Sequence, residues 1–178
     1  MITRTLVLLA TIATIATVAT VAGAQSAPSA TSQIRTNWKD MMANVTAAAE
    51  EVPDAIYAYK PTPEVRSFGA IMAHVAGSQR MFCAMALGDA PAAEDDIEKS
   101  ATTKAAIVAA LKASNDYCER AYAQSDAANA AMVDVFGTQR SRLFALMMNA
   151  THDAEHYGNV VTYMRLNRMV PPSSRPRP

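Results

Sequence analysis

Four long stretches of this sequence carry apolar side chains at intervals of three and four residues, which is the spacing of an amphipathic α-helix. They cover residues 32–52, 68–87, 102–123 and 138–166, and we find no convincing strand pattern beside them. Helices of this length bury their apolar stripes by packing side by side. The sequence therefore predicts an all-α fold, a four-helix bundle.

Helix-capping and helix-breaking residues separate these stretches. Pro53 ends the first helix, Ser67 can cap the second, Gly88 ends it, and Thr102 or Thr103 can cap the third. The connection after Gly88 is polar and acidic. The stretch "QSDAANAAMVDVFGTQ" before the fourth helix is weakly helical at most. Two prolines stop the fourth helix, and we expect residues 173–178 after them to form a disordered tail.

The N-terminal segment is not expected to belong to the bundle. One basic residue, Arg4, precedes an uncharged run over residues 5–21, and small residues follow up to Ala24, as at a signal-peptidase site. We predict a signal peptide over residues 1–24 and one folded domain over residues 25–172, exported to the periplasm or beyond. An uncleaved membrane anchor is the alternative, although the run is too rich in Thr and Ala to be strongly hydrophobic.

Charge gives no sign of a polyanionic partner. The chain has 16 Lys and Arg and 16 Asp and Glu, and signal cleavage would remove Arg4 alone, leaving 15 against 16 and a net charge of −1. No basic stripe with interleaved aromatic residues is present. We therefore expect an unidentified small-molecule substrate, no nucleic acid and no stable membrane insertion after signal cleavage. A homodimer stays open, because bundles with apolar outer faces often dimerise.

The three histidines carry the most chemical information. His152 and His156 are four residues apart, so their rings lie on one face of the predicted fourth helix. His74 lies beside the apolar stripe of the second helix, where an unpaired imidazole would be costly. Neutral imidazole binds Zn, Ni, Mn or Fe. Spacing alone leaves two interpretations open: a shared divalent transition metal, or separate core histidines that are satisfied by other partners.

Other side chains near the histidines are candidates for a role in the site. Asn149, Asn159 and Tyr163 lie close to the face of His152 and His156, and they are our candidates for orienting water or substrate. Asp153 and Glu155 are turned by about 100° from that face, so we expect them on the solvated helix surface. Met148 is one turn before His152 and would suit copper, but methionine at helical spacing is far more often core packing. No general acid or base is evident.

Two segments of the chain resemble one family. The segments "RSFGAIMAHVAGSQ" and "HDAEHYGNVVTYMRLNRMVPP" are similar to the second-helix and fourth-helix blocks of the DinB/YfiT-like superfamily of metalloenzymes. The resemblance implies a four-helix bundle with His74, His152 and His156 as metal ligands and with open coordination positions. Gly69 and Ala70 depart from the family, which often has an acidic residue there. We expect this difference to affect helix capping more than chemistry.

The resemblance also limits the function. It implies a metal-dependent hydrolase or a thiol transferase, and export argues against a thiol cofactor made in the cytoplasm, so we favour hydrolysis. The lack of an evident acid or base keeps a third alternative open, a noncatalytic metal-binding or scaffold bundle.

Two cysteines bear on the topology. Cys83 and Cys118 lie at similar distances from the starts of the second and third helices, so they would be level in parallel helices but about 18 Å apart in antiparallel ones. The resemblance implies a crossover connection between these helices, which makes them parallel. In an exported protein we therefore predict a Cys83–Cys118 disulfide, with two reduced core thiols as the alternative.

Overall fold

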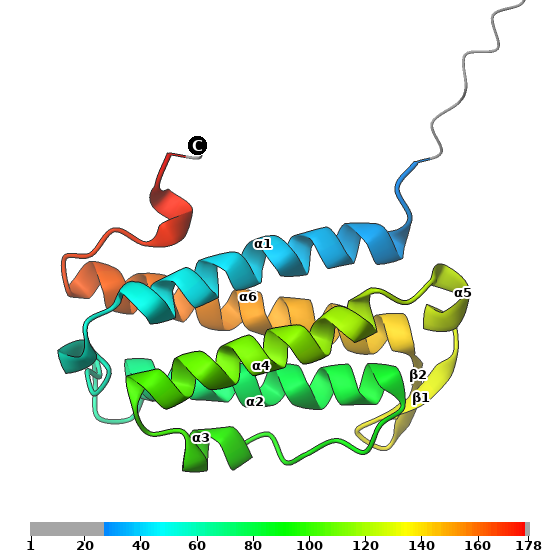
Figure 1. Cartoon of the computed structure of the whole chain (residues 1–178), viewed down its shortest axis with the longest axis horizontal. Coiled ribbons are helices and arrows are strands. Elements are labelled where there is room, and N and C mark those ends of the chain that lie inside the picture. The colour runs from blue at the N-terminus through cyan, green and yellow to red at the C-terminus, as the bar shows by residue number, and fades with distance from the viewer. Residues whose placement is uncertain (1–26, 177–178) are drawn as a thin grey trace, which may run out of the picture.

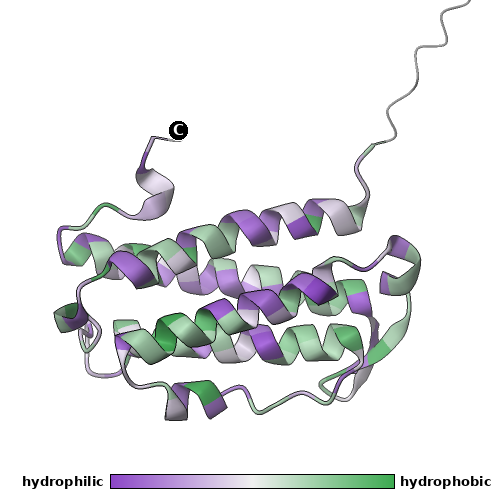
Figure 2. Ribbon diagram, in the orientation of Figure 1, coloured by the Kyte–Doolittle hydropathy of each residue, from purple (hydrophilic) through white to green (hydrophobic). Residues whose placement is uncertain are grey.

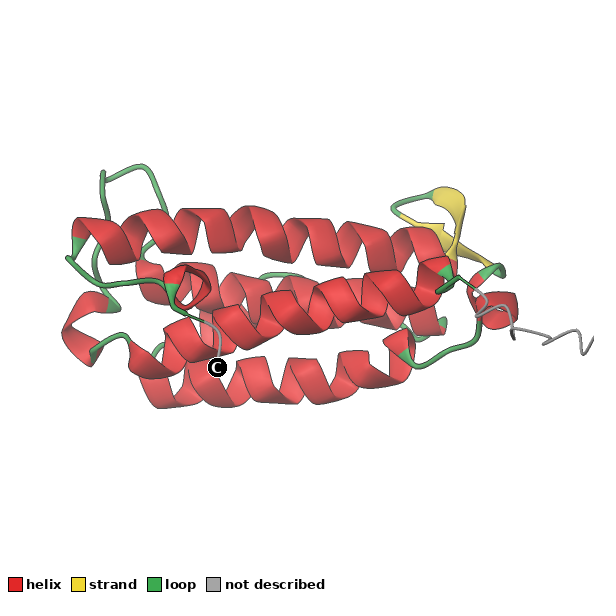
Figure 3. Ribbon diagram, turned by 90° about the horizontal axis from the view of Figure 1, so that it is seen from above, coloured by secondary structure: helices red, strands yellow, loops and turns green. Residues whose placement is uncertain are grey.

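Four long helices pack side by side in the computed structural model, which describes residues 27–176 (Figure 1, Figure 3). They are α1 (Ala30–Glu51), α2 (Phe68–Leu87), α4 (Lys104–Tyr122) and α6 (Arg142–Leu166). The predicted all-α four-helix bundle is confirmed. The predicted signal peptide lies outside the described residues, and none of the helices within them is long and apolar enough to cross a membrane.

A hydroxyl side chain caps the start of each long helix. The side chains of Ser29, Ser67, Thr103 and Ser141 each accept a hydrogen bond from a backbone N–H three residues further on. Such bonds satisfy amide groups that have no partner in the first turn. Gly88 ends α2 in the left-handed conformation with φ at 79°, which glycine adopts without strain. The caps predicted at Ser67 and Gly88 are therefore present.

The connection between α2 and α4 returns along the outside of the bundle. It contains one short helix, α3 (Asp96–Ser100), and it brings α4 into the same direction as α2 (Figure 1). The predicted crossover is confirmed. A disulfide joins Cys83 and Cys118 with a Cα–Cα distance of 5.3 Å, so the predicted pairing is also confirmed.

Helix α2 lies at the centre of the packing. It contacts both α4 and α6, and it is largely hydrophobic (Figure 2). The indole of Trp38 on α1 stacks on Tyr122 with a ring-centroid distance of 4.3 Å. The indole N–H donates to Oε1 of the buried Gln79 on α2 at 2.6 Å. Polar residues inside this core are therefore paired across helices, which lets α2 carry functional side chains at buried positions.

The segment before α6 differs from its prediction. It forms a short helix, α5 (Asp126–Asn129), and a hairpin of β1 (Met132–Val135) with β2 (Thr138–Ser141), so α6 starts later than expected. Phe136 and Gly137 form the turn with φ of 53° and 78°, the conformation of a tight hairpin turn. Glycine suits such a turn but phenylalanine is rare there, and for this reason the sequence did not signal a hairpin.

The C-terminal segment is also more ordered than predicted. Pro172–Ser174 form a 3₁₀ turn, η2. A similar turn elsewhere in the chain, η1 (Asp54–Ile56), follows α1. The hydroxyl of Ser173 hydrogen-bonds the Tyr157 hydroxyl at 3.0 Å, and Arg175 pairs with Glu51 on α1. The prediction of a disordered tail from residue 173 is therefore wrong up to Arg175, because side-chain bonds attach the segment to the bundle.

Candidate metal centre

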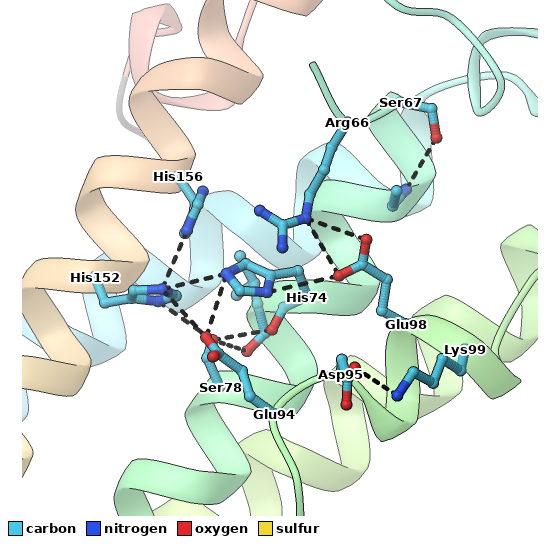
Figure 4. A network of polar contacts seen from close by, with 12 residues as sticks. Arg66, Ser67, His74, Ser78, Glu94, Asp95, Glu98, Lys99, His152 and His156 are labelled. Carbon is cyan, nitrogen blue, oxygen red and sulfur yellow. Dashed lines mark hydrogen bonds and ion pairs between the residues drawn. The ribbon is translucent and has the colours of Figure 1, made fainter. Parts of the chain in front are cut away.

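The three histidines converge between α2 and α6. Nε2 of His152 lies 3.3 Å from Nε2 of His74 and 3.1 Å from Nε2 of His156 (Figure 4). One ring nitrogen from each histidine lies within 4.8 Å of those of the other two. The separation of four residues places two rings on one face of α6, edge to face, and the contact between α6 and α2 brings the third against them. The structure therefore brings together the three histidines that the sequence singled out.

Burial keeps these imidazoles neutral. It lowers the pKa of His74 from 6.5 to about 4, with the positive charge of Arg66 as the next cause. Burial also lowers the pKa of His156 to about 4, with a further contribution from His152, and it lowers that of His152. A protonated imidazole has no lone pair for a metal. At neutral pH the cluster is consequently in the form that binds a cation.

Ser78 orients the central imidazole. Its hydroxyl donates to the backbone oxygen of His74 at 2.9 Å, so its lone pairs can accept from Nδ1–H of His152 at 3.2 Å. This bond selects the tautomer whose Nε2 lone pair points at the other two rings. The sequence offered a signal for Ser78, because it lies four residues after His74 on the same face of α2.

The geometry of the donor atoms fits one metal ion. Ligands about 2.1 Å from a tetrahedral ion lie about 3.4 Å apart, and the two Nε2 separations around His152 are 3.3 and 3.1 Å. The buried Nδ1 atoms of His74 and His156 make no hydrogen bond within the described chain, and the Nε2 atoms of both rings face that of His152. Three histidines could therefore hold a divalent transition metal. Met148 packs against the hydrophobic core instead.

Two carboxylates from the crossover lie beside the cluster. Oε1 of Glu94 is 3.5 Å from Nε2 of His74 and 3.8 Å from Nε2 of His152 (Figure 4). Oε2 of Glu98 is 3.7 Å from Nδ1 of His74, and Nε of Arg66 donates to both Glu98 oxygens at 3.1 and 3.2 Å. Sequence reasoning missed these residues, since a polar, acidic connection does not reveal which of its side chains faces the bundle.

Asn149 does not reach the histidines. Its side-chain amide is fully buried and donates to the Tyr122 hydroxyl at 3.1 Å and to Oδ2 of Asp153 at 3.2 Å. Asp153 is itself fully buried, so its predicted place on the solvated surface is wrong. Asn149 therefore joins Asp153 to Tyr122 on α4, and burial raises the pKa of Asp153 well above its ordinary value.

Asn159 and Tyr163 line a cavity beside the cluster. This cavity has a volume of about 310 Å³, and His156 and Arg66 also border it. The Tyr163 hydroxyl donates to the backbone oxygen of Arg66 at 2.7 Å, which attaches the segment before α2 to α6. Neither side chain hydrogen-bonds a histidine in the described chain. Their geometry suits contact with a molecule in the cavity better than orientation of a ligand.

Comparisons with known proteins identify the family and agree with the fold. The family model described as the DinB superfamily matches residues 37–160. No curated protein matches the chain. The fold is similar to that of a DinB-like protein from Bacillus subtilis (19% identity, 82% of this chain and 99% of the other, TM-score 0.65) and to that of one from Bacillus cereus (15%, 78% and 93%, 0.68). It is also similar to that of the mycothiol-dependent maleylpyruvate isomerase (16% identity, TM-score 0.62), and this match covers 73% of this chain and 60% of the isomerase.

Proposed function

Because this chain belongs to the DinB superfamily, we propose that it is an exported metal-dependent enzyme, and that it hydrolyses a small molecule at the three-histidine site. The observation that carries the proposal is the convergence of three neutral imidazole nitrogens from α2 and α6. Three protein ligands leave coordination positions for water or substrate, as catalytic sites do. A bound Zn, Ni, Mn or Fe ion would lower the pKa of a water molecule or polarise a carbonyl group.

The residues around the cluster have separable tasks in this proposal. Ser78 holds the ring of His152, and the low pKa values keep the ligands deprotonated. The adjacent cavity, bordered by Asn159 and Tyr163, binds the substrate. Phe82, whose ring centroid is 5.7 Å from that of His152, forms an apolar wall that limits water on that side.

Thiol transfer is the second candidate function. The fold is similar to that of an isomerase whose name gives it a thiol dependence, and the open metal positions would equally accept a thiolate. Hydrolysis is favoured because the predicted export would separate the protein from cytoplasmic thiol cofactors, whereas water is present everywhere.

Turnover by metal-loaded protein tests the proposal. The untagged protein would be loaded separately with Zn, Ni, Mn and Fe(II) and assayed on a panel of esters, amides and lactones, with and without added low-molecular-weight thiols. We expect thiol-independent hydrolysis that is lost in His152→Ala and retained in Asp40→Asn, a variant of an exposed residue on α1. Activity that requires a thiol would support the transferase, and activity that survives His152→Ala would contradict a reaction at this site.

A further inference from the structure

The crossover between α2 and α4 brings one carboxylate to the metal cluster. Glu94 belongs to neither ligand helix, yet its Oε1 lies 3.5 Å from Nε2 of His74 and 3.8 Å from Nε2 of His152. These distances are close to the separation of about 3.4 Å between two ligands of one tetrahedral ion. The carboxylate oxygen and the two nitrogens are therefore spaced as neighbouring ligands of one ion.

The charge of Glu94 has no cationic partner in the described part of the chain. Its ion-pair contacts there are to ring nitrogens of His74 and His152, and to no Lys or Arg. Glu98 differs, because the guanidinium of Arg66 already binds both of its oxygens (Figure 4). A carboxylate whose neighbours are imidazole nitrogens, with no Lys or Arg beside it, gains from a cation between them.

The backbone of the crossover is held at this position by a close contact with α2. A Cβ atom on Gly77 would lie 2.1 Å from the backbone oxygen of Glu94, so only glycine permits this approach. Ile97, three residues after Glu94, is partly buried against the core and keeps the next turn in place. The location of Glu94 therefore depends on packing between α2 and the crossover, although its side chain is itself 40% exposed.

We propose that Glu94 is a fourth protein ligand of the metal, so that the crossover adds one glutamate to the three histidines, and an ion with five or six ligands keeps a position open for water or substrate. Carboxylate oxygen binds these ions at about 2.0–2.2 Å, and the exposed side chain can move the short distance required. The anionic ligand strengthens binding of a divalent cation, and metal binding fixes the crossover against α2. This inference rests on the three-histidine site of the proposed function but not on the reaction.

Metal affinity tests the role of Glu94 directly. Zinc affinity would be measured by competition with a chromophoric chelator for the untagged wild type, Glu94→Gln and a matched control, Asp96→Asn. Asp96 is an exposed residue of the same crossover, and its substitution removes the same charge. We expect Glu94→Gln to weaken zinc binding by about 10–100-fold, as loss of a partner of a metal site does, and Asp96→Asn to bind as the wild type does. Equal affinities for Glu94→Gln and Asp96→Asn would overturn the proposal.

A second pair of variants tests how Glu94 is positioned. Gly77→Ala adds a Cβ that displaces the crossover, whereas Gly158→Ala adds one that meets no atom within 4 Å. The proposal is supported if Gly77→Ala binds zinc more weakly than the wild type, Gly158→Ala binds it as the wild type does, and the far-UV circular dichroism of both variants is unchanged. The absorption spectrum of the cobalt(II) form is a readout that a structural role would not move, and it should change in Glu94→Gln. If wild type and His152→Ala bind zinc equally, the three-histidine site fails and this inference fails with it. If His152→Ala weakens zinc binding but Glu94→Gln does not, the inference about Glu94 is overturned and the three-histidine site stands.

Discussion

The disulfide is expected to supply a large part of the stability of the bundle. Cys83 and Cys118 are 35 residues apart, and the loop that they close contains the whole crossover. The chain-entropy relation for a loop of this length gives about 4 kcal/mol of destabilisation of the unfolded state. For a domain of this size, that corresponds to a fall of about 8–15 °C in melting temperature on reduction.

The measurement is urea unfolding of the wild type with and without a reducing agent, followed by circular dichroism. The reduced protein should unfold at lower urea with a larger m-value, because its unfolded chain is less compact. The double variant Cys83→Ala/Cys118→Ala should lose a similar amount plus a small cavity cost, since both sulfurs are buried. An unfolding free energy that reduction changes by less than about 1 kcal/mol would refute the entropic reasoning.

Three further predictions concern buried polar groups. Gln79→Leu leaves the indole N–H of Trp38 unpaired in the core, and should lower the free energy of unfolding by about 1–3 kcal/mol in urea, whereas Gln139→Leu at an exposed position should not. Burial raises the pKa of Asp153, so the native state holds a proton that the unfolded state releases, and stability falls as pH rises. Asp153→Asn should remove this loss, and equal melting curves for the two proteins at about pH 8 would contradict it. Burial lowers the pKa of His74 and His156 from 6.5 to about 4, so the metal-free protein should lose stability as pH falls through that range. A urea midpoint that stays constant there would refute this assignment.

The sequence was sufficient for the bundle because its main determinants are local. Apolar periodicity marked the four long helices, and Ser67 and Gly88 end α2 where capping chemistry places them. The hairpin was missed because its turn uses Phe136, which lacks the usual turn signal. The order of the C-terminal segment was missed because it depends on Arg175 meeting Glu51, 124 residues away in the sequence.

The candidate site was predictable only as far as helical spacing reaches. Residues four apart on α6 must share a face, so His152 and His156 could be paired from sequence. The position of His74 beside the apolar stripe of α2 made it a candidate third ligand, and the family resemblance supported that assignment. Spacing could not show that Asp153 is buried, because that depends on which neighbouring helices cover each face of α6. Nor could it select Glu94, whose position depends on the crossover packing against Gly77.

The central claim is that the three histidines hold one divalent metal ion. The most direct measurement is the metal content per chain of protein purified without a histidine tag, by elemental mass spectrometry, for wild type and His152→Ala. His152 is the decisive residue, because its Nε2 lies within 3.3 Å of those of both other histidines. The structure predicts one equivalent of a transition metal in the wild type and loss of that metal in His152→Ala. Equal, substoichiometric metal in both proteins would contradict the claim.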